Sequence, residues 1–427
     1  MTSVTRQLIL ILLIGFAFPA RAGELPTVRA EKVGMSTERL ARISALAKRY
    51  VDEGKLAGVV TLVARHGKIV HYEAVGKQSL ESSAPMTRDT LFRIYSMSKP
   101  ITAVAAMILY EEGKFQLTDP VSKFVPELKG LKVLKDGQEV PTQSEINMQQ
   151  LLSHTAGFSY GFSAGDPVDK RYLEDKVLSS KDLDEFIKRL AKIPLRYEPG
   201  SRWHYSVAVD VTGAVIERIS GQRFDRFLRE RVFAPLKMED TFFEVPESKL
   251  SRFGSNYRWN VEQRKLEVMP IPDYPLYRNT TFFSGGGGLV STAMDYMRFA
   301  EMLRNGGELE GVRVLSPKTI QLMTMDHLPA TVKPGTSGEA PPVNLGASAG
   351  SGFGLGFGIV TDVPKNGVIG SVGEYSWSGA AGTVFWVDPV EEIVVVGMVQ
   401  LMQSPWPLRR ELKTLTYQAL TELNRKH

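Results

Sequence analysis

Apolar residues recur at helical spacing near the start of the chain and then give way to a strand-like pattern. Residues 36–58 carry a stripe that one face of a helix would bury, and Gly54 marks its end. The stripe consists of Leu40, Ile43, Leu46, Ala47, Tyr50 and Val51. Residues 58–76 follow as two runs rich in β-branched side chains joined at His66-Gly67, a pattern typical of a β-hairpin.

The C-terminal part of the chain repeats these elements in reverse order. Residues 353–360 and 382–402 predict strands, with a turn at Asp388-Pro389, and residues 408–423 predict a closing helix. Strands and a helix at both ends indicate that the two ends of the chain build one antiparallel sheet covered by helices.

The middle of the chain, from about residue 87 to 305, is mainly helical in pattern. Its helical stretches are 101–114, 182–193, 210–233 and 293–307. We therefore expect a fold of the α/β plus all-α type, in which a helical subdomain (about 87–305) is inserted into a sheet subdomain (about 30–86 and 306–427), with a site in the cleft between them. The Gly- and Pro-rich stretch 328–352 predicts an irregular loop, either a surface excursion or a substrate lid.

Composition narrows the class of protein. The 427 residues suffice for one large domain, and a net charge of +5 without basic runs gives no reason to expect a nucleic-acid partner. Cysteine is absent, which excludes a thiol nucleophile, a disulfide framework and a lipoprotein anchor. We expect no metal and no cofactor, because there is no H-E-x-x-H motif and the glycine run 285–288 lacks a following Lys-Ser/Thr.

The N-terminus has the order of a secretory signal peptide. Arg6 precedes an apolar run from Leu8 to Phe18, and Ala20-Arg21-Ala22 follows, so we expect cleavage after Ala22 and a mature chain of residues 23–427 that is periplasmic or secreted. The alternative is an uncleaved N-terminal anchor, although the run is short for a membrane span. After cleavage no stable membrane insertion is expected.

Ser96 and Lys99 form an S-x-x-K motif where a helical pattern begins. Residues three apart share a helix face, so the amine reaches the hydroxyl. A lysine accepts the serine proton when burial lowers its pKa, and the helix N-terminus favours negative charge on the serine. Pro100 is tolerated there because it lies in the first turn.

Two further segments offer groups for a serine nucleophile. Tyr205 stands just ahead of another helical pattern, where a phenolate would shuttle a proton if the residue lies near Lys99, the alternative being a packed aromatic. Residues 377–380 stand at the entry to a strand, where backbone amides would form an oxyanion hole together with the amide of Ser96.

The stretch GFSYGFSAG, residues 157–165, contains G-x-S-x-G around Ser159 and again around Ser163. No strand precedes and no helix directly follows these serines, so the turn that gives this motif its chemistry is not expected. The stretch predicts a loop beside the cleft whose aromatic residues either shape an apolar acyl pocket or pack on one another. Of the histidines near these segments, His154 is expected to pack, and His204 to touch the cleft.

These segments in this order, with LLSHTAGF (151–158), PGSRWHYS (199–206) and SGGGGLVST (284–292), resemble the serine β-lactamase and penicillin-binding protein superfamily. The chain is most similar to the family VIII carboxylesterases, which share the class C β-lactamase fold. The resemblance runs from about Val33 to Leu423 and implies a β-lactamase/transpeptidase-like fold.

The resemblance also implies roles for individual residues. Ser96 would be the acylated nucleophile, Lys99 would activate it, and Tyr205 would be the general base. The oxyanion amides would belong to Ser96 and Ala380. Substrate contacts are expected from Trp377, Ser378, Gly379, Phe158 and Tyr160.

Two departures from the β-lactamase pattern point toward esters. Tyr-x-Asn appears here as Tyr205-Ser206-Val207, so the side-chain amide that binds a substrate amide is missing. Lys-Thr-Gly appears as Trp377-Ser378-Gly379, which replaces a cation by an aromatic wall. We therefore expect a serine esterase for short- to medium-chain esters. The alternatives are a β-lactamase or D-amino-acid peptidase, and a catalytically silent peptidoglycan-binding relative.

Overall fold

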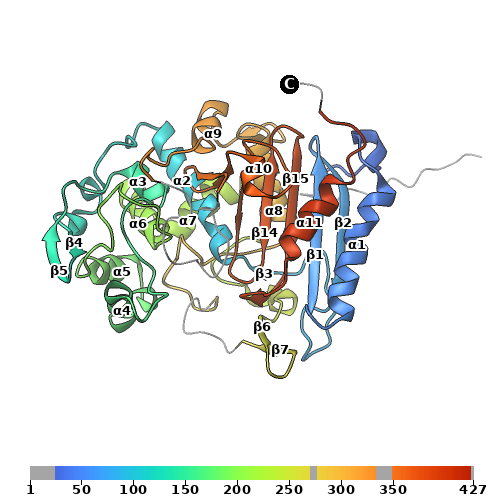
Figure 1. Cartoon of the computed structure of the whole chain (residues 1–427), viewed down its shortest axis with the longest axis horizontal. Helices are drawn as coiled ribbons and strands as arrows, with labels where there is room; N and C mark the ends of the chain where they lie inside the picture. The colour runs from blue at the N-terminus through green and yellow to red at the C-terminus, as the bar shows by residue number, and fades with distance from the viewer. Residues whose placement is uncertain (1–24, 270–276, 333–348, 425–427) are drawn as a thin grey trace, which may run out of the picture.

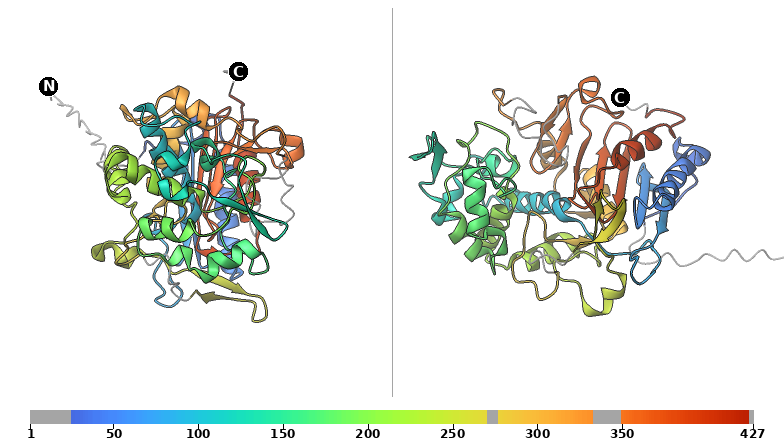
Figure 2. Two further views of the ribbon diagram at one scale, coloured as in Figure 1. Left: turned by 90° about the vertical axis from the view of Figure 1, so that its left-hand side faces the viewer. Right: turned by 60° about the horizontal axis from the view of Figure 1, so that its bottom comes forward.

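The computed structural model describes residues 25–269, 277–332 and 349–424. The expected signal peptide and its cleavage after Ala22 lie outside these ranges, as does most of the loop expected at 328–352. A large sheet with flanking helices forms one side of the molecule, and a mainly helical part forms the other (Figure 1). Both ends of the described chain lie on the sheet side (Figures 1 and 2).

One seven-stranded sheet joins the two ends of the chain, as predicted. Its order is β11-β12-β13-β14-β15-β1-β2, and neighbouring strands pair antiparallel throughout. The bounds are β1 Gly58–Arg65, β2 Lys68–Gly76, β11 Ser351–Phe353, β12 Gly358–Val360, β13 Tyr375–Ser378, β14 Val384–Asp388 and β15 Ile393–Met398. The predicted hairpin turn between β1 and β2 has φ 53° at His66 and 73° at Gly67, the left-handed geometry that such turns require.

Helices cover both faces of this sheet. Helices α1 (Thr37–Asp52) and α11 (Leu408–Tyr417) lie on one face, and α8 (Ala293–Arg304) packs on the other. Alternate residues of β15 serve the two faces: Val395 packs with α1 and α11, whereas Val394 and Val396 join the core that contains α8. This alternation explains why the central strand β15, with the sequence IVVVGM, has no polar side chain on either face.

Helix α11 ends at Tyr417, six residues before residue 423, where the sequence pattern predicts its end. Beyond its end the carbonyl of Ala419 accepts a hydrogen bond of 2.8 Å from the amide of Ser36, and Leu420 forms a β-bridge with Met35. Pairing with the segment before α1 therefore replaces the last predicted helical turn.

The helical part of the molecule contains most of the remaining helices. They are α2 Ser98–Glu111, α3 Met148–Leu152, α4 Pro167–Glu174, α5 Leu183–Leu190, α6 Ala208–Ser220 and α7 Phe224–Leu228. The continuous helix predicted over 210–233 is wrong, because Gly221 adopts φ 67° and ends α6. A short π-helical turn, Arg229–Phe233, continues α7.

Short strands and two further small helices complete the described fold. The hairpins β4–β5 and β6–β7 were not predicted; β6 also pairs with β16 in parallel, and β3 pairs with β8. The bounds are β3 Phe92–Arg93, β4 Lys132–Lys135, β5 Gln138–Pro141, β6 Tyr257–Asn260, β7 Lys265–Val268, β8 Val290–Ser291, β9 Glu308–Leu309, β10 Val312–Arg313, β16 Leu401–Met402, α9 Pro317–Met323 and α10 Val363–Asn366.

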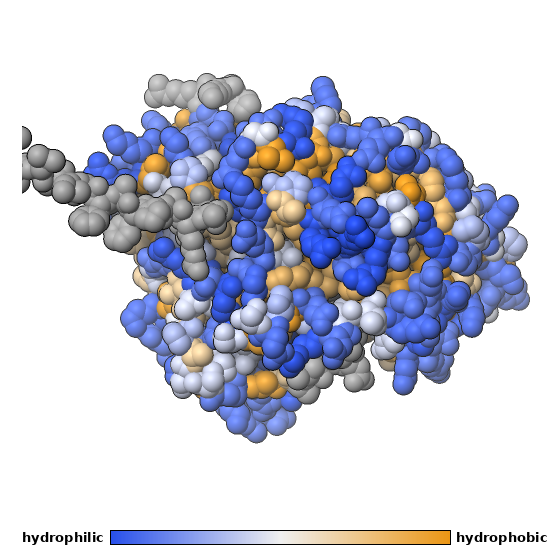
Figure 3. All heavy atoms as spheres, turned by 180° about the vertical axis from the view of Figure 1, so that it is seen from behind, coloured by the Kyte–Doolittle hydropathy of each residue, from blue (hydrophilic) through white to orange (hydrophobic). Residues whose placement is uncertain are grey.

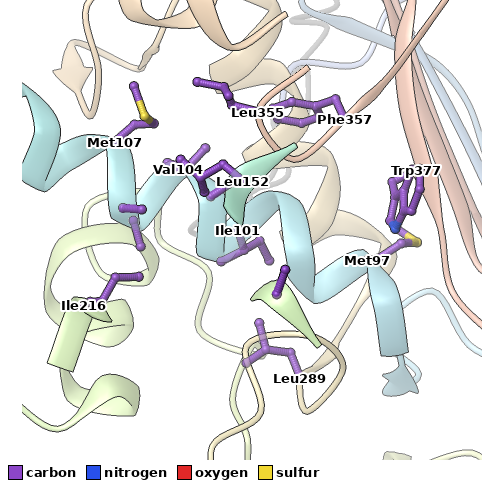
Figure 4. Close-up of a cluster of buried hydrophobic side chains, with 14 of the residues drawn as sticks. Met97, Ile101, Val104, Met107, Leu152, Ile216, Leu289, Leu355, Phe357 and Trp377 are labelled. Atoms are coloured by element: carbon purple, nitrogen blue, oxygen red, sulfur yellow. The ribbon is translucent and has the colours of Figure 1, made fainter. Parts of the chain in front are cut away.

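Helix α2 runs through the centre of the molecule and joins its two parts. Its residues from Ser98 to Leu109 are all buried. Figure 4 shows Ile101, Val104 and Met107 on this helix among Leu152, Ile216, Leu289 and Leu355, which come from segments far apart in sequence. Burying each such side chain contributes about 1.5–3 kcal/mol, so the start of α2 is held rigidly.

Polar residues dominate the face of the molecule seen in Figure 3. On the face seen in Figure 3, hydrophobic side chains gather in small patches between hydrophilic ones. Within the described ranges no helix combines the length and the hydropathy of a membrane span, and no group of three His, Asp or Glu side chains is placed to hold a metal ion.

Candidate active site

Ser96 lies on a tight turn at the entrance to α2. The turn is a 3-10 helix, Tyr95–Met97, and Tyr95 has φ 42°, a left-handed conformation that is strained for a side chain of this size. Asn256 holds the Tyr95 hydroxyl with a hydrogen bond of 2.9 Å. The turn leaves Ser96 partly exposed, while Lys99, one helical turn on, is only 1% exposed.

The structure brings the predicted Ser96, Lys99 and Tyr205 together. The Lys99 Nζ lies 3.3 Å from the Ser96 Oγ, and the Tyr205 hydroxyl lies 2.5 Å from the same Oγ. The two shared contacts place one hydroxyl between a buried amine and a buried phenol. Groups placed in this way can take a proton from a serine and return it to a leaving group.

Lys99 is held by the glycine run rather than by a carboxylate. Its Nζ donates to the carbonyl of Gly286 at 2.6 Å and contacts the Tyr160 hydroxyl at 3.2 Å. The run is fixed on α2, since Thr102 donates to the carbonyl of Gly285 at 2.9 Å. Burial lowers the pKa of Lys99 to about 7, with the negative charge of Asp210 opposing the shift. The amine is therefore available as a base near neutral pH.

Tyr205 is surrounded by aromatic rings. Tyr160 stacks on it at 5.4 Å between centroids, and Trp377 packs against it at 5.8 Å. Burial raises the pKa of Tyr205 above its ordinary range, and the nearby Ser96 hydroxyl and Trp377 indole offset only part of this rise. The phenolate expected from the sequence is therefore not the resting form; Tyr205 is a neutral phenol near neutral pH.

The loop 157–165, with its two G-x-S-x-G matches, is organised by a carboxylate of α4. Asp169 accepts hydrogen bonds from the Ser159 hydroxyl, from the amide of Gly161 at 3.0 Å and from the amide of Ser163 at 2.9 Å. Ser159 is 1% exposed. Its hydroxyl serves this internal network, and neither serine lies on a strand-to-helix turn.

The aromatic residues of this loop have different surroundings. Tyr160 reaches Lys99, and Phe162 stacks on Tyr160 at 4.6 Å with a 6° angle between the rings. Phe162 is 63% exposed. Phe158, predicted as a substrate contact, is 1% exposed and belongs to the main core, because the first residues of the loop, 157–159, are all buried.

The segment 377–380 leaves β13 beside the turn that carries Ser96. Gly379 is required there, because a Cβ atom would lie 2.3 Å from the Thr383 Oγ1 and 2.4 Å from the carbonyl oxygen of Ile94. The carbonyl of Ala380 accepts a hydrogen bond from the amide of Gln403 at 3.2 Å. The close approach of Gly379 to Ile94 places the segment beside a residue that precedes Ser96 by two positions.

A cavity of about 490 Å³ lies alongside the same segment. Trp377, Ser378, Gly379 and Ala380 line it together with Arg409 of α11. Ser96 and Lys99 are not among its lining residues. The buried Ser378 hydroxyl has no hydrogen-bond partner in the described structure.

The two histidines near the site support its walls. His154 is fully buried, packs 4.9 Å from the Tyr205 ring, and has its pKa held well below the usual range by burial. A neutral packed histidine is what the sequence predicts. The His204 Nε2 lies 3.2 Å from the Ser159 Oγ, so it contacts the loop 157–165.

Sequence reasoning missed Asp210 and the role of Gly286. Asp210 lies on α6, is fully buried, and accepts hydrogen bonds from the Ser284 hydroxyl and from the amide of Gly286 at 3.0 Å. A usable signal existed: Asp210 is the one charged residue in the apolar run 205–216, and Asp is rarely buried without a partner.

Comparison with known proteins identifies the family of the chain. The Beta-lactamase family model matches residues 43–418. The chain is 37% identical to Protein Rv1367c of Mycobacterium tuberculosis, covering 83% of this chain and 88% of that one. It is 32% identical to Esterase EstB of Burkholderia gladioli, covering 82% and 87%.

Solved structures lead to the same class of protein. The structure of EstCE1, a hydrolase with promiscuous acyltransferase activity, superposes with a TM-score of 0.76 and 28% identity, covering 90% of this chain and 99% of that one. The fold and the serine site therefore define a serine hydrolase with the β-lactamase/transpeptidase-like fold. The chain belongs to the beta-lactamase family, among relatives that include esterases.

Proposed function

We propose that this protein is a serine carboxylesterase that hydrolyses short- to medium-chain esters through an acyl-enzyme on Ser96. The observation that carries the proposal is the Ser96 hydroxyl, which contacts both the Lys99 amine and the Tyr205 phenol. The esterase relatives support the ester as substrate.

Acylation begins with the neutral Lys99 amine. Ser96 Oγ attacks the ester carbonyl carbon while its proton passes to the Lys99 Nζ, 3.3 Å away. The ester C–O bond then breaks, and the alkoxide leaves with a proton from the Tyr205 hydroxyl, which Lys99 replaces. In deacylation, water gives its proton to the same pair and attacks the acyl carbon. The bond between this carbon and the Ser96 Oγ then breaks, and the pair returns the proton to Oγ, which releases the acid and free Ser96.

The surroundings of the serine favour neutral, apolar substrates. The position of the β-lactamase lysine is occupied by Trp377, which is 2% exposed and packs on Tyr205. Val207, which stands where the family has asparagine, is buried in the core. The site thus lacks the cation and the amide that suit a β-lactam or a peptide, and a site without such partners discriminates against those substrates.

The test measures hydrolysis of p-nitrophenyl butyrate, a chromogenic cephalosporin and a D-Ala-D-Ala peptide. We expect ester turnover in the wild type and a loss of at least about 10³-fold in Ser96→Ala. The matched control is Ser163→Ala, the serine of the second G-x-S-x-G match, which keeps its amide bond to Asp169 and is expected to retain ester turnover.

Other outcomes would replace the proposal. Faster turnover of the cephalosporin or the peptide than of the ester would favour the β-lactamase or peptidase alternative. Absence of all three activities would favour a silent binding relative. Ester turnover that survives Ser96→Ala would contradict the mechanism. A mass shift of the intact protein by one butyryl group, absent in Ser96→Ala, identifies the acylated residue.

A further inference from the structure

Asp210 is a buried carboxylate with one oxygen unpaired. Its Oδ1 accepts from Ser284 and Gly286, whereas its Oδ2 is buried and has no hydrogen-bond partner in the described structure. Leaving such an oxygen unsatisfied costs about 1–3 kcal/mol or more. A group kept at that cost needs a compensating interaction, and the neighbouring positive charge is that of Lys99.

Gly286 connects the two charged groups. Its amide donates to Asp210 at 3.0 Å, and its carbonyl receives the Lys99 Nζ at 2.6 Å. A Cβ atom on Gly286 would lie 2.4 Å from the Asp210 Oδ2 and 2.9 Å from the Tyr160 hydroxyl. The unpaired oxygen and the phenol that contacts Lys99 therefore converge on this glycine, and a side chain there would separate them.

The groups that face Lys99 come from several elements. Asp210 approaches from α6, Tyr160 from the loop 157–165, and Tyr205 from the segment before α6. The fourth is His154, next to α3, whose depressed pKa keeps it neutral. Among the described residues, Asp210 thus supplies the negative charge that acts on this amine.

We infer that Asp210 is a positioning residue for the proposed reaction: it holds Gly286 so that its carbonyl fixes Lys99, and its charge stabilises the ammonium group that forms when Ser96 is deprotonated. The inference rests on the proposed function. It explains the isolated aspartate on α6 and the unpaired oxygen together. Burial raises the pKa of Asp210, while Lys99, Ser284 and Gly286 oppose that rise.

The test compares the pH dependence of kcat/KM for p-nitrophenyl butyrate in the wild type and Asp210→Asn. The asparagine oxygen can still accept from Ser284 and Gly286, so the substitution removes mainly the charge. Without the Asp210 charge the Lys99 ammonium is less stable. We therefore expect the acid limb of the pH profile, the range in which kcat/KM rises with pH, to move down by about one pH unit or more. We also expect kcat on the plateau to fall about 10-fold to 100-fold.

Asp388→Asn is the matched control. Asp388 is a fully buried carboxylate at the end of β14 that accepts from the Tyr417 hydroxyl at 2.7 Å, away from Lys99. The acid limb of the pH profile of Asp388→Asn is expected to coincide with that of the wild type. An unmoved limb in folded Asp210→Asn would overturn the inference.

Ser284→Ala keeps the inference testable if Asp210→Asn does not fold. This variant retains the carboxylate but removes a hydrogen bond that favours its charged form. A smaller downward shift of the limb is expected, and no shift would count against the inference. Failure of the proposed function is recognised separately, because it appears as missing ester turnover in the wild type or as full turnover in Ser96→Ala.

Discussion

The Tyr160 hydroxyl lies 3.2 Å from the Lys99 Nζ, so the loop 157–165 contacts the proposed base directly. Tyr160→Phe removes this contact and keeps the ring that stacks on both Tyr205 and Phe162. A hydrogen bond to a charged group contributes about 1.5–3 kcal/mol, so we expect kcat to fall about 10-fold or more. Steady-state kinetics with p-nitrophenyl butyrate measures this, and an unchanged kcat would show that the contact has no part in turnover.

The proposed base predicts the pH dependence of the wild type. Below its pKa of about 7, Lys99 carries a proton and cannot accept one from Ser96. We therefore expect kcat/KM to rise with pH through about 7 and then to level off. The raised pKa of Tyr205 keeps the phenol protonated over the plateau. A profile that falls through neutral pH would contradict this assignment of the base.

The same lysine affects stability. Burial lowers the pKa of Lys99 from 10.5 to about 7 in the folded protein, so unfolding takes up a proton between these values. The contribution of this group to the free energy of unfolding therefore increases with pH across that window. Urea unfolding at pH 7 and pH 9 measures the slope, and Lys99→Met is expected to reduce it. An equal slope in both proteins would contradict the depressed pKa.

Gly379→Ala tests the close approach of β13 to the nucleophile turn. The new Cβ would meet the Ile94 carbonyl oxygen and the Thr383 Oγ1 at 2.4 and 2.3 Å, so the strand end must move away from the turn. A shift of about 1 Å near reacting groups reduces the rate about 10²-fold, and we expect a loss of that size in kcat/KM. Gly165→Ala, with no atom within 4 Å of its Cβ, is the control and should change little.

Asp169→Ala tests what organises the loop 157–165. The substitution leaves the amides of Gly161 and Ser163 without their carboxylate acceptor. We expect the free energy of unfolding to fall by about 2–4 kcal/mol and kcat to fall with it, because Tyr160 loses its placement. Chemical denaturation and ester kinetics measure both. A stable variant with normal kcat would show that the loop holds its shape without Asp169.

The sequence predicts the local parts of this site better than their meeting points. Ser96 and Lys99 are three residues apart across the 3-10 turn and the first turn of α2, so spacing alone places them together. Tyr205 meets them across 109 positions, which residue patterns cannot establish; there the family resemblance supplied the expectation. Asp210 and Gly286 were missed because their roles arise from packing between α6 and the glycine run. Phe158 was misplaced because a short loop has no periodicity to separate inward from outward residues.

The helices and strands follow the same rule. The sheet with both ends of the chain was predictable, because alternation and turn residues are local signals. The helix predicted over 210–233 was divided at Gly221, a residue whose stop signal competed with a continuing apolar pattern. The end of α11 was set by pairing with residues near Met35, a tertiary contact that overrides helix propensity.

Phe162 is expected to determine part of the substrate preference. It is 63% exposed, yet its ring is held by stacking on Tyr160 at 4.6 Å, and its centroid lies 6.5 Å from the Tyr205 ring. An exposed aromatic ring beside the nucleophile offers apolar surface to an ester group, and covering it stabilises the complex at about 25 cal/mol per Å². For Phe162→Ala we expect a several-fold rise in KM for p-nitrophenyl butyrate with kcat nearly unchanged, and a smaller rise for the acetate. Because the ring is largely exposed, thermal unfolding should change little. A loss confined to kcat would instead show that Phe162 acts by holding Tyr160 in place.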